Sequence, residues 1–178
     1  PDTVAASVLM RALEDPGSVA MDLVRPMPRP PAPSARRGTR LHAWIEARYG
    51  QQSLLDPDDL PGAGDEGIGS DEALERLKAA FESGPYARRA PVAVEEAFAV
   101  MVGGRVVNGR IDAVFERDGR FEVVDWKTGH AGAADPLQLA YYRLAWAELM
   151  GLSPTAVEAV FYDVLSATVI RPRELPDR

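Results

Sequence analysis

The chain has 178 residues, of which 46% are hydrophobic and 26% are charged, values that fit one globular domain with a sizeable core. It contains no cysteine, which excludes disulfides, zinc-thiolate sites and cysteine-ligated iron–sulfur clusters within the chain. Any bound metal would therefore need oxygen or imidazole ligands. The formal net charge of −7 argues weakly against a simple electrostatic nucleic-acid binder, because such domains are usually basic.

The sequence has neither an apolar run long enough to span a bilayer nor the pattern of a signal peptide at its start. We therefore expect a soluble intracellular protein without a membrane partner. Because the chain begins at Pro1 and not at methionine, we also expect it to be a piece of a longer protein.

The N-terminal segment, residues 1–33, is expected to precede the main domain. A partial apolar stripe predicts a short helix over residues 2–14, capped by Asp2 or Thr3. The prolines between Arg25 and Pro33 then favour an extended connector. Residues 34–178 are expected to form a single globular domain.

Helical signals dominate the first half of that domain. A helix is predicted from Ser34 to the stop at Gly50, with a core stripe formed by Leu41, Trp44, Ile45 and Tyr49. The acidic, glycine-rich residues 51–70 predict an exposed loop, and residues 71–82 an amphipathic helix.

From residue 91 the apolar period changes to two. Strands are predicted over residues 92–100, 106–115 and 121–127, with hairpin turns at Gly103-Gly104 and Asp118-Gly119. Asp135 and Pro136 begin a predicted helix that ends at Gly151, and two last strands follow Pro154.

The chemistry of the sequence is concentrated between Gly109 and Gly129. Asp112 lies on one predicted strand, and Asp125 and Lys127 lie on the next. Since side chains alternate along a strand, Asp125 and Lys127 point to the same face. Burying these charges is unfavourable unless they are paired or bind a metal, so one hypothesis is a Mg²⁺ or Mn²⁺ site with ligands from Asp112 and Asp125. The alternative is a cross-strand ion pair between Asp112 and Lys127 on a solvated face.

Other polar residues also have two interpretations. His42 borders the core stripe of its helix and is either a ligand or a histidine held there by hydrogen bonds. Only one of Glu95 and Glu96 can share the face of Asp112. Gln138 lies one turn from Tyr142, and it also has the position of a capping-box partner for Asp135. The basic segment that precedes His42 could contact phosphates, through Arg36, Arg37 and Arg40.

These residues occur in an order that resembles the RecB-family nuclease domain of the PD-(D/E)xK superfamily. The resemblance rests on motifs that together cover more than half of the chain: Gly38-Thr-Arg-Leu-His42, Gly109-Arg-Ile-Asp112, Val123-Val-Asp125-Trp-Lys127-Thr-Gly129 and Gln138-Leu-Ala-Tyr-Tyr142-Arg-Leu-Ala145. In particular, the chain is similar to the C-terminal nuclease domain of bacterial helicase-nucleases of the AddAB and AdnAB type.

The resemblance implies an α/β fold with a restriction-endonuclease-like core, a mixed central sheet flanked by helices. It implies that the metal ligands are His42, Asp112, Asp125 and the backbone carbonyl of Trp126. Glu95 matches a less strict acidic position that would hold a water or a second ion. The resemblance further implies that Lys127 orients the attacking water and that Gln138 and Tyr142 support the site and the DNA backbone.

The implied activity is metal-dependent hydrolysis of DNA phosphodiester bonds in the bacterial cytoplasm, during the processing of double-strand ends. The implied partners are a DNA single strand, a helicase motor in the same parent chain and a second subunit. The sequence has no ATP-binding motif of the Gly-x4-Gly-Lys-Ser/Thr kind, so we expect the motor to lie outside this chain. The four-cysteine iron–sulfur staple of several relatives cannot form here. Two rivals are a catalytically inactive module for DNA docking or subunit assembly, and a stand-alone endonuclease.

Overall fold

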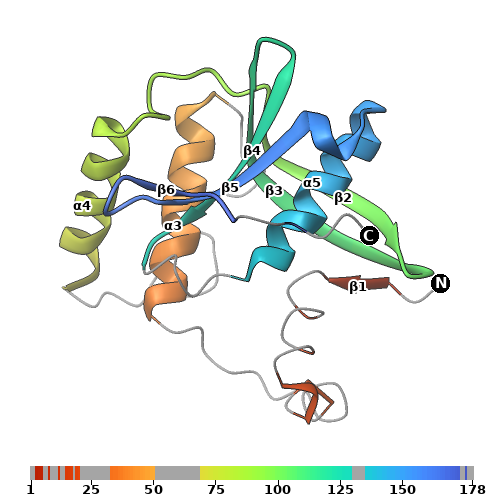
Figure 1. Ribbon diagram of the computed structural model, residues 1–178. Coiled ribbons are helices and arrows are strands. Elements are labelled where there is room, and N and C mark those ends of the chain that lie inside the picture. Colours follow the sequence, from red (N-terminus) through yellow and green to blue (C-terminus); the bar gives the residue numbers. More distant parts are fainter. Residues whose placement is uncertain are drawn as a thin grey trace.

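A computed structural model describes residues 3–5, 8, 12, 15–17, 19–20, 33–50, 69–129, 135–172 and 175. Its described elements form three layers, with a central β-sheet between two layers of helices (Figure 1). Helices α3 (Pro33–Arg48) and α4 (Gly69–Ser83) cover one face of the sheet, and α5 (Pro136–Met150) covers the other. The predicted α/β fold class is confirmed.

The sheet has six strands and mixes parallel with antiparallel pairing. The strands are β1 (Thr3–Ala5), β2 (Ala93–Val102), β3 (Arg105–Arg117), β4 (Arg120–Lys127), β5 (Val157–Asp163) and β6 (Thr168–Ile170). Strand β3 pairs antiparallel with both β2 and β4, and β4 pairs in parallel with β5. Strand β6 pairs antiparallel with β5.

Two tight turns define the β2–β3–β4 meander, as predicted. Gly103 and Gly104 have φ angles of 56° and 79°, and Asp118 and Gly119 have φ angles of 54° and 76°. Positive φ at both central residues is typical of the type I′ turn, whose twist matches that of a hairpin. These turns therefore fix the register of β3 against its neighbours.

Helix α5 has the ends that its sequence predicts. The Asp135 side chain accepts a hydrogen bond from the Leu137 amide at 2.9 Å, and Pro136 occupies the first turn. At the other end Gly151 adopts a left-handed conformation with a φ of 65°. The helix is thereby held at a defined position along the sheet, with its N-terminal turns beside the end of β4.

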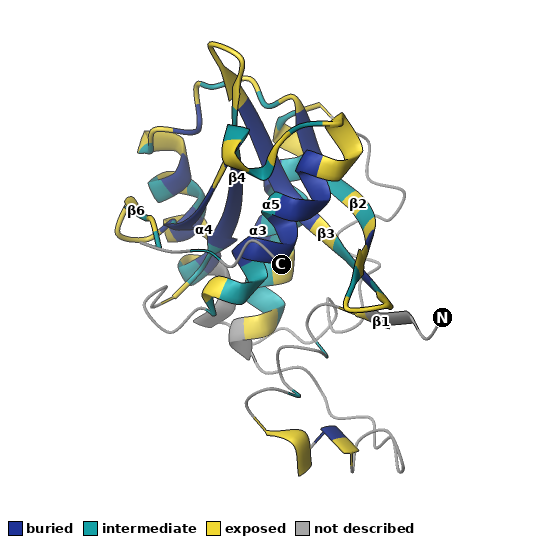
Figure 2. Cartoon of the chain, turned by 45° about the vertical axis from the view of Figure 1, so that its right-hand side comes forward, coloured by how far each residue is buried: buried dark blue, intermediate teal, exposed yellow. Residues whose placement is uncertain are grey.

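Each face of the sheet has its own hydrophobic core, and the deeply buried residues lie in the middle of the sheet (Figure 2). The α5 side includes Ile111, Val114, Val123 and Phe161, together with α5 residues such as Leu139 and Trp146. The opposite side includes Ala113, Phe115, Val124 and Trp126, packed against Leu41, Ile45, Leu77 and Phe81 of α3 and α4. Packing on both faces leaves few places in the sheet where a charged side chain can lie.

The N-terminal prediction was wrong in part. Residues Thr3–Ala5 are not the start of a helix but strand β1, which pairs in parallel with Val106–Asn108 of β3. This edge of β3 is free there because β4 pairs with β3 at its other end, and β-branched Thr3 and Val4 suit a strand. Val8 and Ala12 are helical. The predicted connector up to residue 32 and the predicted loop over residues 51–68 lie outside the described residues.

Among the described helices, none combines the length and the apolar character that crossing a membrane requires.

Candidate metal centre

The site lies where β3 and β4 part. Their pairing runs from Arg117–Arg120 to Ala113–Val124 and stops before Asp112 and Asp125. Beyond that point the Trp126 amide donates a hydrogen bond to Asp112 Oδ2 at 2.8 Å, so a carboxylate replaces a backbone acceptor in the fork between the strands. Asp112 and Asp125 are the buried charged residues of the described chain, with 6% and 2% of their surfaces exposed.

The alternation of side chains between the two faces of the sheet also changes in β3 at this point. Val107 and Ile111 pack on the α5 side, but so does Val114, whereas Ala113 packs on the α3 side. The regular alternation is therefore interrupted at Asp112. Opposite it on β2, Glu95 has a φ of 50°, a strained conformation for a residue with a side chain.

Helix α3 brings His42 to this interruption. His42 Nδ1 lies 3.5 Å from Glu95 Oε1 and 3.5 Å from Asp112 Oδ1. One ligand atom from each of these residues lies within 4.8 Å of the others, which is close enough for one cation to contact all three. On the other side of the ring, Nε2 lies 3.3 Å from the Trp126 carbonyl oxygen, to which it can donate a hydrogen bond.

A hydrogen-bonded network from α5 completes the site around Asp125. Lys127 Nζ lies 2.6 Å from Asp125 Oδ2 and donates to Gln138 Oε1 at 3.0 Å. Gln138 Nε2 donates to Asp125 Oδ1 and to the Tyr142 hydroxyl, each at 2.8 Å. Gln138 therefore holds the carboxylate, the ammonium and the phenol in one arrangement.

The pKa values of the central groups show how strongly they interact. Burial raises the pKa of Asp112 from 3.8 to about 7; Asp125 and Glu95 add to this rise, while His42 and the Trp126 amide oppose it. Burial lowers the pKa of His42, but Asp112, Glu95 and Asp125 raise it more, from 6.5 to about 9. Burial also raises the pKa of Asp125, against the opposing effect of Lys127. The site is thus short of positive charge.

The donor set fits a divalent cation. It offers carboxylate oxygens and one imidazole nitrogen, ligands that suit Mg²⁺ and Mn²⁺. Asp125 Oδ2 is buried and accepts no aligned hydrogen bond from the described part of the chain, although Lys127 lies next to it. A buried acceptor of this kind, beside a carboxyl with a raised pKa, is the arrangement that a bound cation would stabilise.

Most of the residues predicted from the sequence meet here, although not in a single cluster. The tight group contains His42, Asp112 and Glu95. Asp125 lies next to it and is engaged by Lys127 and Gln138, and the Trp126 carbonyl lies on the far side of the imidazole. Whether these residues ligate a metal remains a prediction.

The structure also decides between several alternatives from the sequence. Lys127 pairs with Asp125 on its own strand, and no ion pair joins it to Asp112, although the structure describes both. The Gln138 side chain reaches into the site and does not cap α5. Of the two glutamates on β2, Glu95 faces His42, whereas Glu96 pairs with Ile111 on β3.

The predicted arginines lie on the first turns of α3, close to the end of β4. A Cβ atom at Gly38, between Arg37 and Arg40, would lie 3.7 Å from Thr128 Oγ1. Arg36, Arg37 and Arg40 are all half-buried. Their helix segment is therefore next to the site, whereas contact with DNA remains a prediction.

Two neighbours of the site were not predicted from the sequence. Arg110 lies 3.8 Å from Glu95 Oε2, and Lys127 Nζ lies 5.0 Å from the centre of the Phe161 ring. Arg110 belongs to a predicted motif and could have been noticed there. The proximity of Phe161 depends on the parallel pairing of β4 with β5, which places Phe161 opposite Asp125 and has no local signal.

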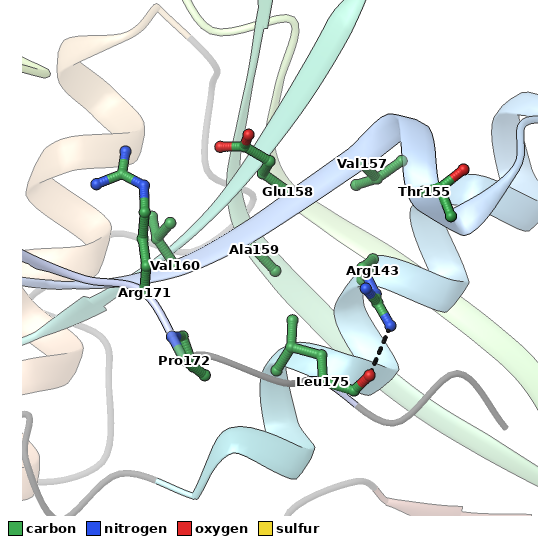
Figure 3. Close-up of a pocket in the computed structure, with 9 residues that line it drawn as sticks. All are labelled: Arg143, Thr155, Val157, Glu158, Ala159, Val160, Arg171, Pro172 and Leu175. Atoms are coloured by element: carbon green, nitrogen blue, oxygen red, sulfur yellow. Dashed lines mark hydrogen bonds between the residues drawn. The ribbon is translucent and has the colours of Figure 1, made fainter.

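A cavity of about 320 Å³ lies elsewhere, beside β5 (Figure 3). Arg143 of α5 closes one wall by donating to the Leu175 carbonyl at 3.0 Å, and Glu158 and Arg171 lie on the other side of the strand. None of the residues around Asp112 lines this cavity, so it is separate from the candidate metal centre.

Comparisons with known proteins agree with this fold. A sequence model of the PD-(D/E)XK nuclease superfamily matches residues 19–176. No curated protein sequence matches the chain. Among solved structures, a "putative exonuclease" from Eubacterium rectale superposes with a TM-score of 0.60 at 13% identity, over 88% of this chain. The chain spans 65% of that protein, and at this identity the likeness shows the fold alone.

The family match extends over nearly the whole chain and includes every residue of the candidate centre, and the fold agrees with it. The chain belongs to the PD-(D/E)XK nuclease superfamily.

Proposed function

We propose that this protein is a metal-dependent DNA nuclease, and that it serves as the nuclease module of a bacterial helicase-nuclease that processes DNA double-strand ends in the cytoplasm. The observation that carries the nuclease assignment is the juxtaposition of two buried aspartates, His42, Glu95 and Lys127 at the fork between β3 and β4. The superfamily match supports phosphodiester hydrolysis as the reaction class.

In this proposal His42, Asp112 and Asp125 hold a Mg²⁺ or Mn²⁺ ion, with the Trp126 carbonyl as a further ligand. When bound, the ion would polarise the phosphate and lower the pKa of a water molecule. Glu95 either joins the ligands or holds a water, since its carboxylate faces the same imidazole nitrogen as Asp112.

The remaining residues position the reacting groups. Lys127 is held by Asp125 and Gln138, from where its ammonium can donate to the attacking water and offset negative charge that develops on the phosphate. Gln138 fixes the rotamers of Lys127 and Asp125, and Tyr142 fixes Gln138. The contacts that hold Lys127, Asp125 and Gln138 are present without DNA, which favours an electrostatic contribution of several kcal/mol to catalysis.

The nuclease proposal is tested with labelled linear single-stranded and double-stranded DNA in the presence of Mn²⁺. We expect cleavage by the wild type and its loss in Asp125→Asn, while Asp118→Asn retains full activity, because Asp118 lies in an exposed turn. Cleavage by Asp125→Asn at the wild-type rate would refute the assignment. A chelator should abolish wild-type cleavage.

The rival function is an inactive nuclease fold that docks DNA or assembles subunits. The raised pKa values and the intact constellation disfavour it, because an inactive module has no chemical need for this costly arrangement. Calorimetric titration with Mn²⁺ distinguishes the nuclease from the docking module. Mn²⁺ binding that His42→Ala weakens supports a functional metal site, and absence of binding supports the docking module.

The helicase context rests on the sequence motifs that resemble AddAB and AdnAB nuclease domains. In such a protein the motor would deliver a single strand to the site. The parent protein should then degrade linear duplex DNA only when ATP is present, and ATP-independent cutting of circular duplex by the parent would instead support a stand-alone endonuclease.

A further inference from the structure

Arg110 is an exposed cation beside the candidate metal centre. Its side chain is 60% exposed, and it lies two residues before Asp112 on β3. Val107 and Ile111 face the α5 side, so Arg110 faces the opposite side, the one that α3 covers further along the sheet. Arg110 therefore lies on the side of the sheet where α3 carries His42.

The β2 residues beside Arg110 on its face of the sheet are small. Its direct partner on β2 is Ala97, and the next partner pair on the same face is Ala99 with Asn108. Ala97 and Ala99 are both exposed. Phe98 and Val100, which alternate with them along β2, pack on the α5 side. At this end of β2 and β3 most residues are half-buried or exposed, with Val100 and Val107 as the buried exceptions (Figure 2). The alanines of β2 therefore do not cover the guanidinium, and Glu95 is the β2 residue that contacts it in the described part of the chain.

A chain of contacts connects this surface to the metal centre. Arg110 Nη1 lies 3.8 Å from Glu95 Oε2, and the other oxygen of Glu95 lies 3.5 Å from His42 Nδ1. The contact between Arg110 and Glu95 is long, at the limit of an ion pair, so a phosphate that comes closer to the guanidinium can replace it. Glu46, one turn after His42, is close enough that Arg110 lowers its pKa, although burial and Glu95 raise that pKa overall.

We propose that the exposed face of β2 and β3 formed by Ala97, Ala99 and Arg110 is the surface over which a DNA strand reaches the metal centre, and that Arg110 binds a phosphate next to the one that is cleaved. This inference rests on the proposed nuclease function and extends it to the path of the substrate.

The guanidinium of Arg110 and its distance from Asp112 along β3 support a DNA strand as the occupant. Two residues along a strand span about 7 Å, so the Arg110 side chain can reach a phosphate that neighbours one held at Asp112. An exposed guanidinium suits phosphate recognition because its parallel N–H groups can bind two oxygens at once. The small alanines leave room for the sugar-phosphate backbone above the sheet.

The test measures DNA affinity in the Asp125→Asn background with Mn²⁺, so that the substrate stays intact, by fluorescence anisotropy of a labelled single strand. We expect Arg110→Gln to weaken binding roughly tenfold at low salt, as expected for one charged hydrogen-bonded contact. The slope of log affinity against log salt should fall by about 0.7, the value for one phosphate contact on a single strand. Arg110→Lys should keep the slope and lose part of the affinity.

Arg117→Gln is the matched control, because Arg117 is 87% exposed on the same strand at its far end. It should leave affinity and slope unchanged. Equal affinity and slope for Arg110→Gln would overturn the inference. Mn²⁺ affinity is also measured for Arg110→Gln in the otherwise wild-type chain. A loss of Mn²⁺ affinity as large as the loss of DNA affinity would overturn the inference too, because Arg110 would then act only through Glu95. A wild-type protein that neither binds nor cuts DNA would instead refute the proposed function itself.

Discussion

Asp112 is a carboxyl group that its surroundings hold between two protonation states. Burial and the neighbouring acids favour the neutral form, whereas the Trp126 amide and His42 favour the charged one. The result is a pKa of about 7, so a proton and a metal ion can compete for the same oxygen near neutral pH. His42, with a pKa of about 9, holds a second proton that a metal must displace.

We therefore predict that Mn²⁺ binding releases protons and strengthens as the pH rises from 6 to 9. Both raised pKa values act in this direction, because each group is more protonated in the metal-free site than its ordinary pKa would make it. Calorimetry at pH 7.5 in buffers of different ionisation enthalpy should show release of about one proton or more. An affinity that is equal at pH 6 and pH 8.5 would contradict the prediction.

Gln138 holds the side chains of Lys127 and Asp125 in position through hydrogen bonds. It accepts from Lys127 and donates to Asp125, so its removal takes one hydrogen bond from each group and leaves them in contact with one another. We predict that Gln138→Leu lowers kcat by about 10-fold to 100-fold with little change in KM, as is common when groups that orient a site are lost.

Tyr142→Phe is the matched control for Gln138. It removes one of the hydrogen bonds that hold Gln138 but none that reach Lys127 or Asp125. Its effect on kcat in single-turnover cleavage should therefore be the smaller of the two. If Gln138→Leu mainly raised KM and left kcat nearly unchanged, Gln138 would instead contact the DNA.

The secondary structure elements around the site were largely predictable because their signals are local. Asp118-Gly119 specifies a hairpin turn by itself, and Asp135 with Pro136 specifies the start of α5. These signals place Asp112, Asp125 and Gln138 on the correct strands and helix. Alternation along β4 also correctly predicts that Asp125 and Lys127 share a face, which their 2.6 Å contact confirms.

Features that depend on distant parts of the chain could not be predicted in this way. Strand β1 forms because β3 has a free edge at Val106, which nothing near Thr3 reveals. Glu95, which faces His42, has a positive φ that is uncommon for glutamate, and it lies where the pairing of β2 with β3 is interrupted at Asp112. Local patterns therefore identify the elements, whereas tertiary contacts decide which acids meet.

The loop after α4 contains a position where only glycine fits. A Cβ atom at Gly84 would overlap the Tyr162 hydroxyl and lie 3.1 Å from the Phe81 carbonyl oxygen. We predict that Gly84→Ala destabilises the protein by about 1–3 kcal/mol, the usual cost of overpacking, as measured by urea unfolding.

Tyr162 supplies the test of this mechanism. Its hydroxyl is buried and makes no hydrogen bond to the described part of the chain, so Tyr162→Phe should be neutral or stabilising by about 1 kcal/mol. In the double variant the added methyl group loses its main clash, and we expect Gly84→Ala to cost clearly less than in the wild type. Strictly additive free energies of unfolding would show that the destabilisation has another origin.

At the scale of the whole molecule, the metal centre is where the layers meet. His42 comes from the α3 side of the sheet and Gln138 from the α5 side, and both reach the fork between β3 and β4. A cation bound there would connect both helical layers to the sheet. Binding should therefore stabilise the whole fold, by about 2.7 kcal/mol when the free ion is at 100 times its dissociation constant.

The metal-free protein should in turn become less stable as the pH rises, and the sign follows from the two raised pKa values. Stability from His42 is fully present below its unfolded pKa of 6.5 and is lost as the pH rises through about 9. Stability from the neutral Asp112 is present below 3.8 and is lost as the pH rises through about 7. Between pH 5 and pH 9 both contributions fall, so we expect the free energy of unfolding in the presence of a chelator to decrease across this range.

Asp112→Asn isolates this effect from the titration of the rest of the chain. Asparagine keeps an oxygen for the Trp126 amide, but it removes the buried carboxyl and the main charge that raises the pKa of His42. The wild type should therefore lose more stability than Asp112→Asn between pH 5 and pH 9. Mn²⁺ should restore stability to the wild type most strongly at the alkaline end, where protons compete least, and should do so weakly for the variant. Parallel stability curves for the two proteins would mean that burial of Asp112 and its contact with His42 do not raise the pKa values of these two groups as this structure requires.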